Sequence, residues 1–145
     1  MGTAAITHSP IEPESVLQQV GAAGDGAVVL FLGTVRDTSG GQAVTGMQYD
    51  AYEAMAREVL EAIVVEAAEQ WGVEHLVAVH RVGHLSVGEV SAAIAGSSPH
   101  RAEAYAASRQ VIEQIKLRLP VWKQEHYATG DARWVPGAVP LPEEA

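Results

Sequence analysis

Two long helical segments, each with a sharp end, limit the folds open to this chain of 145 residues. The first runs from Glu53 to Trp71 and is followed by Gly72, a residue that often ends helices. Its apolar positions recur every four residues and are Met55, Val59, Ile63, Ala67 and Trp71. The second runs from Pro99 to Leu119, with Ser98 as the expected N-cap, and Pro120 stops it. Each helix needs a sheet or another helix to cover its apolar face.

The segments around these helices have the composition of strands. Ala27–Val35 is a nearly continuous apolar run, typical of a central strand that is covered on both faces. The Gly-rich segment Arg36–Gln42 separates it from a partly alternating segment, Ala43–Tyr52, and this arrangement predicts a long hairpin with a mobile tip. Further strands are expected at Glu74–Val82, Glu89–Ser97, Val121–Tyr127 and Ala132–Val135, with Gly83–Gly88 as a turn.

This order of elements predicts an α+β fold with a mixed or largely antiparallel sheet and two long helices. The length fits one domain spanning residues 1–145. We expect an ordered core over about residues 13–135, beginning with a short helix at Pro13–Val20. Residues 1–12 are expected to be irregular and flexible, and the acidic, Pro-rich C-terminal tail to be frayed.

Charge and cysteine content exclude several classes of function. A formal net charge of -9 argues against unspecific binding to nucleic acid or anionic lipid, because both require a positive field. No apolar run is long enough to cross a bilayer and no secretory signal is recognisable, so a cytoplasmic location is expected. The chain has no cysteine, so any sulfur chemistry must use sulfur carried by another molecule.

The chain contains only two lysines, Lys116 and Lys123. A helical wheel places Lys116 on the apolar face of the second helix, beside Tyr105, Ile112, Ile115 and Leu119. Such a lysine can have a lowered pKa and act as a base, nucleophile or proton donor, or it can simply extend its ammonium into water. Strand alternation puts Lys123 and Glu125 on one face, as a surface ion pair or as part of a pocket shared with Lys116.

Other cations could bind an anion. His100 and Arg101 lie in the first turn of the second helix, where the helix dipole disfavours cations unless an anion is bound; a solvated Arg and a capping His are the alternative. Arg36 lies where a strand meets a Gly-rich loop, a common place for a ligand, although an exposed structural role is also consistent. His80 and His84 flank a turn and could chelate, but no tight ligand spacing occurs, so no metal site is expected.

Several motifs together resemble one family. They are FLGTVRD, YEAM, HRVGHLSVGE, SSPHRAEAY, IEQIKLRLPVWKQE and GDARWV, in order, between about residues 26 and 135. The chain thereby resembles the MoaE family, the large subunits of molybdopterin synthases. The resemblance implies an α/β hammerhead-type fold and a homodimer that forms a heterotetramer with two copies of a small ubiquitin-like subunit.

The resemblance also implies an activity. The small subunit carries sulfur as a thiocarboxylate on its C-terminal Gly-Gly tail, and the large subunit transfers this sulfur to cyclic pyranopterin monophosphate to make the dithiolene of molybdopterin. The pterin is a substrate, and no permanently bound cofactor is implied. A partner as sulfur source agrees with a chain that has no cysteine.

Residue by residue, the resemblance implies a catalytic role for Lys116 and Lys123. The residues that it implies for substrate binding are Thr34, Val35, Arg36, His100, Arg101, Lys116, Lys123, Gln124 and Glu125. Phe31 and Ile112 fall where apolar pocket residues are expected. Some relatives have Lys at the position of Thr34, which leaves the contacts to the phosphate end open.

One geometric expectation does not depend on the family. His100 and Lys116 are 16 residues apart on one helix, and a rise of about 1.5 Å per residue separates them by roughly 24 Å. Both can serve one substrate only if the site is shared between two protomers. Two other functions stay open: a dimeric adaptor that only grips the tail of a ubiquitin-like protein, and a metal-dependent phosphohydrolase, which the spacing of His and Asp disfavours.

Overall fold

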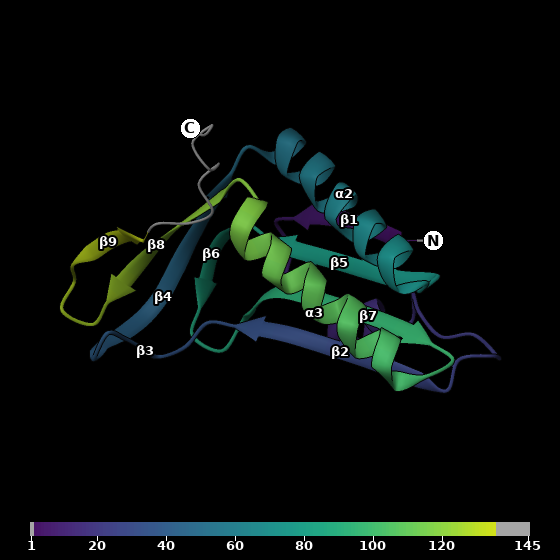
Figure 1. Ribbon diagram of the computed structural model, residues 1–145. Coiled ribbons are helices and arrows are strands. Elements are labelled where there is room, and N and C mark those ends of the chain that lie inside the picture. The colour runs from purple at the N-terminus through teal and green to yellow at the C-terminus, as the bar shows by residue number, and fades with distance from the viewer. Residues whose placement is uncertain (1, 136–145) are drawn as a thin grey trace.

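Two sheets and a pair of long helices make up the computed structural model, which describes residues 2–135 (Figure 1). The elements are β1 (Gly2–Thr7), α1 (Pro13–Leu17), β2 (Ala27–Thr34), β3 (Thr38–Ser39), β4 (Gln42–Ala51), α2 (Glu53–Trp71), β5 (His75–Arg81), β6 (Gly83–Ser86), β7 (Val90–Ser98), α3 (Arg101–Arg118), β8 (Val121–Tyr127) and β9 (Ala132–Val135). The predicted α+β class, with mixed and antiparallel pairing and two long helices, is confirmed. The predicted C-terminal tail lies outside the described residues.

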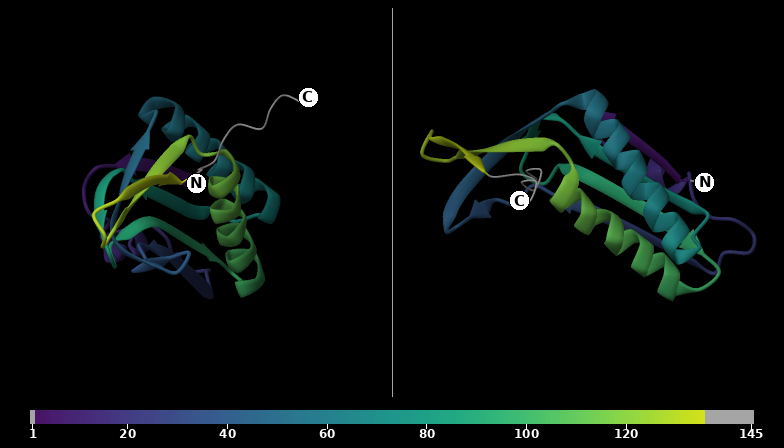
Figure 2. Two further views of the ribbon diagram at one scale, coloured as in Figure 1. Left: turned by 90° about the vertical axis from the view of Figure 1, so that its left-hand side faces the viewer. Right: turned by 45° about the horizontal axis from the view of Figure 1, so that its top comes forward.

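The first sheet has the strand order β1-β5-β7-β2. Strand β1 runs parallel to β5, and the other neighbours are antiparallel. Both long helices lie across one face of this sheet, α2 over β1 and β5 and α3 over β7 and β2 (Figures 1 and 2). The short helix α1 packs on the opposite face, against β7.

Side-chain alternation along these strands divides the core in two. On β5, Leu76 and Ala78 point toward the long helices, whereas Val77 points toward α1. On β7, Ile94 faces the long helices and Ala93 and Ala95 face α1. Period-two alternation therefore determines which residues of β5 and β7 can reach α3.

The second sheet has the order β3-β4-β8-β9, and β6 pairs with the long strand β4 as well. It extends beyond the C-terminal end of α3, and β8 follows that helix directly (Figure 1). The sharp stop at Pro120 lets the chain leave α3 and enter β8 within two residues. Residues of both sheets therefore meet at the C-terminal end of α3.

Helix α2 has the predicted bounds, Glu53–Trp71, and Gly72 caps it with a left-handed φ of 65°. The predicted apolar face is partly wrong, because Met55 and Trp71 are 55% and 38% exposed. A four-residue step turns about 40° too far around a helix, so a strict four-residue row drifts off the core. The buried positions are Ala56, Leu60, Ile63, Val64 and Ala67.

Helix α3 begins later than predicted, at Arg101, and Ser98 is not its N-cap. Ser98 is the last residue of β7, where it pairs with Ala27, and its hydroxyl donates to the carbonyl of His100. His100 occupies the N-cap position and makes no side-chain cap bond. The predicted place of Tyr105 on the apolar face is also wrong, since its side chain is 62% exposed.

Non-local pairing overturns several strand predictions. The N-terminal segment is not irregular, because Gly2–Thr7 forms an edge strand on β5. Strand β2 is not central: within the described residues it pairs only with β7, and Val28 is exposed. The long hairpin is wrong as well, since β2 and β4 belong to different sheets and only β3 folds back on β4.

The predicted turn at Gly83–Gly88 contains an unpredicted strand, β6, which pairs with β4. Gly83 has a φ of 104°, which lets the chain leave the first sheet at Arg81 and join the second. The predicted strands at Glu74–Val82 and Glu89–Ser97 are β5 and β7 within one residue at each end, and β8 and β9 have the predicted bounds. The predicted short helix at Pro13–Val20 is shorter, since α1 ends at Leu17. Among the helices within residues 2–135, none is long and apolar enough to cross a membrane.

The tight packing of β4 between β6 and β8 predicts a cost for any side chain at Gly46. A Cβ at this position would lie 2.8 Å from the backbone carbonyl oxygen of Leu85, and neither backbone can move without disturbing a ladder. We expect Gly46→Ala to lower the free energy of unfolding by about 1–3 kcal/mol, measured by urea denaturation. Gly24→Ala is the matched control, because a Cβ there meets no atom within 4 Å. Equal stability of the two variants would contradict the packing described.

Candidate functional site

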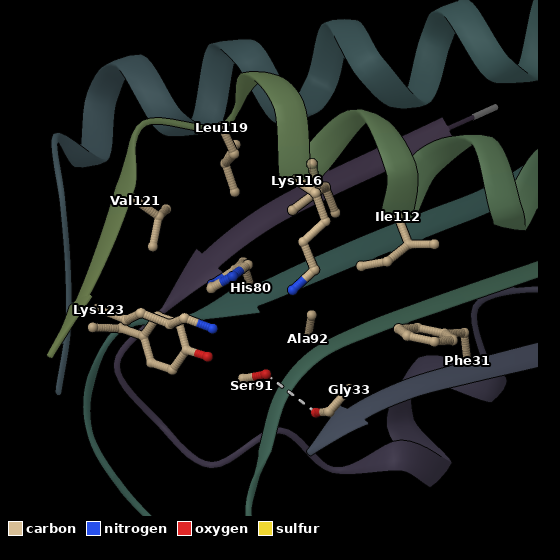
Figure 3. A pocket seen from close by; sticks show the side chains of 12 residues that line it. Phe31, Gly33, His80, Ser91, Ala92, Ile112, Lys116, Leu119, Val121 and Lys123 are labelled. Atoms are coloured by element: carbon tan, nitrogen blue, oxygen red, sulfur yellow. Dashed lines mark hydrogen bonds between the residues drawn. The ribbon is translucent and has the colours of Figure 1, made fainter. Parts of the chain in front are cut away.

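A pocket of about 190 Å³ opens where the C-terminal end of α3 meets the two sheets (Figure 3). Three strands of the first sheet, two strands of the second and the last turns of α3 contribute to it. The lining residues are Phe31, Gly33, Tyr49, His80, Ser91, Ala92, Ile112, Ile115, Lys116, Leu119, Val121 and Lys123. Its floor is therefore mostly apolar, and its polar groups come from separate segments of the chain.

The register of the first sheet brings the floor residues together. Gly33 on β2 and His80 on β5 are both paired with Ala92 of the central strand β7, so all three lie in one row across the sheet. Phe31 is two residues before Gly33 and faces the same side, toward α3. A one-residue slip of either ladder would turn this row to the opposite face.

A β-bulge adds a polar group to the row. Gly33 pairs with Ala92 but Thr34 pairs with Val90, so Ser91 is the extra residue of β7. Both Ser91 and Ala92 therefore reach the pocket, and the Ser91 hydroxyl donates to the carbonyl oxygen of Gly33 at 3.2 Å.

Lys116 and Lys123 approach the pocket from different elements, α3 and β8, and both line it. Figure 3 shows their amines directed into the same space. Burial lowers the pKa of Lys123, and the charges of Lys116 and Arg36 lower it further, while Glu125 acts in the opposite direction. Arg36 thus lies close enough for its charge to act on the pocket. The lysine pair concentrates positive charge in a chain whose net charge is -9.

His80 lies between the two lysines and is only 6% exposed (Figure 3). Its Nδ1 lies 2.9 Å from the carbonyl oxygen of Arg81, and its ring makes an edge contact with that of Tyr49 at 5.4 Å between centroids. Burial lowers the pKa of His80 to about 4; the bond to Arg81 opposes the shift and the charges of Lys116 and Lys123 add to it. The imidazole is therefore neutral at physiological pH.

Tyr49 also stays neutral. Burial raises its pKa, the neighbouring Ser91 hydroxyl opposes this shift, and the charge of Glu125 adds to it. The pocket thus combines two amines with a neutral imidazole, a phenol and a hydroxyl. This set can bind an anionic group, surround it with neutral hydrogen-bonding groups and exclude most of the water around it.

Of the residues that sequence reasoning singled out, Phe31, Ile112, Lys116 and Lys123 line the pocket. Glu125 lies on the same face of β8 as Lys123 but is buried outside the lining, where it accepts a hydrogen bond from the Tyr127 hydroxyl at 2.7 Å. Burial would raise its pKa, but the bonds from Tyr127 and Ser39 and the charges of Lys123 and Arg133 lower it overall. Glu125 is held ionised as a neighbour of the pocket.

Three further residues that the sequence singled out for substrate binding do not line the pocket. Thr34 is exposed at the end of β2. Val35 is buried in a small cluster with Met47 and Leu85. Gln124 alternates to the other face of β8 and hydrogen-bonds His126 at 3.0 Å.

His100 and Arg101 lie at the opposite end of α3 from Lys116, and both are exposed. The helix between them is unbroken over Arg101–Arg118. The structure of one chain therefore does not bring these two residues to the pocket.

Sequence reasoning missed Tyr49 and Ser91 and considered His80 only as a chelator. His80 instead bonds the Arg81 carbonyl, while His84 stacks on His126 at 5.7 Å between centroids. Within residues 2–135, no group of three or more His, Asp or Glu side chains is placed to hold a metal ion. The sequence did contain a signal for His80: the alternation of β5 puts it on the same face as Leu76 and Ala78, toward the long helices.

Known proteins are similar in sequence to this chain over most of its length. The sequence model of the MoaE protein family matches residues 6–118. The molybdopterin synthase catalytic subunit of Halalkalibacterium halodurans is 41% identical over 131 residues, which cover 90% of this chain and 83% of that protein. The catalytic subunit of Bacillus subtilis is 39% identical over 130 residues, covering 90% and 82%.

A solved structure of a molybdopterin synthase has the same fold as this chain. The crystal structure of molybdopterin synthase from Staphylococcus aureus superimposes with a TM-score of 0.85 at 36% sequence identity, covering 90% of this chain and 95% of that one. Sequence and fold thus agree over most of the chain, including the strands and the helix that form the pocket. This chain belongs to the MoaE protein family.

Proposed function

We propose that this chain is the catalytic subunit of a molybdopterin synthase. It takes sulfur from the thiocarboxylated C-terminus of a small ubiquitin-like subunit and transfers it to cyclic pyranopterin monophosphate, giving the dithiolene of molybdopterin. The observation that carries this proposal is the convergence of Lys116 and Lys123, the only lysines of the chain, on one pocket. Family membership and relatives named as catalytic subunits of this enzyme support it.

The shape of the pocket supports a narrow peptide tail as its ligand. A volume of about 190 Å³ is small, and a Gly-Gly end has no side chains to place in it. The apolar floor, which includes Phe31 and Ile112, excludes water, and the two ammonium groups neutralise the terminal thiocarboxylate. The incoming tail brings the sulfur that a chain without cysteine cannot supply.

The two lysines also take part in the sulfur transfer itself. In each of two rounds, the thiocarboxylate sulfur forms a bond to a carbon of the pterin as the bond from that carbon to an oxygen breaks, and one of these oxygens leaves on the phosphate when the cyclic phosphate opens. Water then adds to the acyl carbon and cleaves its bond to sulfur, which leaves the sulfur on the pterin and the tail as a carboxylate. Negative charge develops on the acyl oxygen during this cleavage, where Lys116 and Lys123 stabilise it. Lys116, at the mouth of the pocket, also moves protons between water and the reacting groups. Alternatively, its amine displaces the pterin thiolate from the acyl carbon to form a transient amide, which water then hydrolyses to the carboxylate.

The phosphate end of the pterin is held by Arg36 and, from a second protomer, by His100 and Arg101. Arg36 is near enough to the pocket to lower the pKa of Lys123, whereas His100 and Arg101 lie at the far end of α3. A homodimer that brings the start of one α3 to the end of the other completes the site. We place the reaction in the cytoplasm, because a reducing compartment protects a free sulfur anion from oxidation.

Replacing Lys116 tests the catalytic assignment. We expect Lys116→Ala to lower the rate of dithiolene formation by about 10²–10⁴-fold with a thiocarboxylated small subunit and saturating precursor. Arg109→Ala is the matched control, because it removes an exposed cation from the same helix far from the pocket lining. A Lys116→Ala protein that converts precursor as fast as this control would refute the proposal. An adaptor without catalytic function would form no dithiolene and show no saturable binding of the cyclic phosphate.

The shared site predicts complementation between two inactive variants. In a mixed dimer of Lys116→Ala and His100→Ala chains, one site combines the intact Lys116 of one chain with the intact His100 of the other. Random re-association should therefore restore roughly a quarter of the wild-type activity. Activity is measured after the two proteins are unfolded together and refolded, with each variant refolded alone as the control. No recovery above those controls would mean that both residues act within one chain.

The coupling between the lysines predicts a change in titration. Removing the charge of Lys116 should raise the pKa of Lys123, which stays below its ordinary value because burial remains the larger cause. Reductive ¹³C-methylation and NMR give one side-chain signal per lysine, since the chain has only two. Lys116→Gln should move the Lys123 titration to higher pH. Arg118→Gln, which removes a cation paired with Glu66 from the same helix end, should not.

A further inference from the structure

One ring nitrogen of the pocket has no hydrogen-bond partner in the part of the chain that the structure describes, and it has no role in the steps above. The Nδ1 of His80 lies 2.9 Å from a carbonyl oxygen, that of Arg81, so Nδ1 must carry the hydrogen and donate it. The lone pair of a neutral ring then sits on Nε2. No group within residues 2–135 donates a hydrogen bond to Nε2. An acceptor that lines the pocket and is not engaged by another described residue is available to a ligand.

The surroundings keep this nitrogen an acceptor. Burial and the charges of Lys116 and Lys123 lower the pKa of His80 to about 4, against the smaller effect of the Arg81 carbonyl. The edge contact with Tyr49, at an interplanar angle of 71°, fixes the ring plane. Figure 3 shows the imidazole between the amines of the two lysines. The pocket thus presents a fixed neutral acceptor flanked by two cations.

The other polar side chains of the lining are less available as acceptors. The Ser91 hydroxyl donates to the carbonyl of Gly33 and lies against the Tyr49 hydroxyl, so these groups are engaged with one another. No carboxylate is among the lining residues. His80 is accordingly the side chain best placed to receive a hydrogen from a ligand.

This arrangement favours a ligand that has an anionic group and a hydrogen-bond donor close together. A simple anion without a hydrogen to donate, such as sulfate, is attracted by the lysines but repelled by the lone pair of Nε2. A peptide C-terminus can bind the lysines and Nε2 of His80 at the same time, because its last amide N–H is separated from the terminal carboxyl carbon by a single Cα. When the carboxyl end lies between the lysines, that N–H is within reach of a group that lies between them too.

We propose that His80 is a specificity-determining residue, whose Nε2 accepts a hydrogen bond from the last peptide N–H of the incoming Gly-Gly tail while Lys116 and Lys123 hold its terminal carboxyl or thiocarboxyl group. This inference rests on the proposed function, because that function supplies the tail. It gives the pocket a means to distinguish a peptide end from free anions.

Two synthetic peptides test this role. Both carry the same six residues and end in Gly-Gly, but in one the last amide is replaced by an ester, which removes the N–H and keeps the shape. Calorimetry should show that the wild-type chain binds the amide about five- to tenfold more tightly than the ester. In His80→Phe, which keeps a ring but has no acceptor, this preference should vanish. In His80→Gln, whose side-chain oxygen is a neutral acceptor, part of it should return.

The outcomes separate the possible roles of His80. A wild-type chain that binds both peptides equally, or binds neither, overturns the inference, and so does a preference that persists in His80→Phe. If His80→Phe does not fold, ¹⁵N NMR of the wild-type imidazoles decides. The amide peptide should then shift the Nε2 signal of His80, assigned by its absence in His80→Gln, and the ester should not. Equal shifts with both peptides overturn the inference.

The inference and the proposed function can fail separately. A chain that makes dithiolene but does not discriminate amide from ester keeps its function and loses this role for His80. A chain that discriminates the two peptides but makes no dithiolene keeps the tail-binding role and loses sulfur transfer.

Discussion

Strand β7 hydrogen-bonds to β5 on one side and to β2 on the other, and the register of these two ladders determines the pocket. Because His80 and Gly33 pair with the same residue, Ala92, the floor of the pocket is a row across three strands far apart in sequence. The bulge at Ser91 depends on this register as well. Side chains of α3 close the row from above, so a shift of either ladder would remove the site without changing any site residue.

The electrostatics of the pocket follow from that placement. Burial lowers the pKa of Lys123, and the charge of the neighbouring Lys116 lowers it further. Both ammonium groups line a cavity that an anion can occupy, and a bound anion would offset their repulsion. Burial, with a smaller contribution from the two lysine charges, keeps the neighbouring imidazole of His80 neutral. Positive charge and an uncharged acceptor therefore coexist within one pocket, a combination that a surface lysine pair in water would not produce.

Local patterns in the sequence predicted the elements whose boundaries depend on local chemistry. Gly72 ends α2 through its left-handed conformation, and Pro120 separates α3 from β8, so both positions could be predicted. The edge strand β1 and the position of β2 could not, because each depends on a ladder to a strand far along the chain. The lysines stood out by their rarity, whereas His80 became a site residue only through pairing with Ala92.

Helix α3 has opposite electrostatic character at its two ends. Its last turn carries Lys116 and Arg118, where the dipole favours cations. Its start carries His100 at the N-cap position and Arg101 as the first helical residue, where the dipole disfavours cations and no side-chain cap bond forms. A bound phosphate would offset that cost and use the free backbone N–H groups. Under the proposed function, one rigid helix thus serves two sites. The C-terminal end of α3 binds the sulfur-bearing tail of the small subunit in the pocket of its own chain. The N-terminal end of α3 binds the phosphate of the pterin in the pocket of the second protomer.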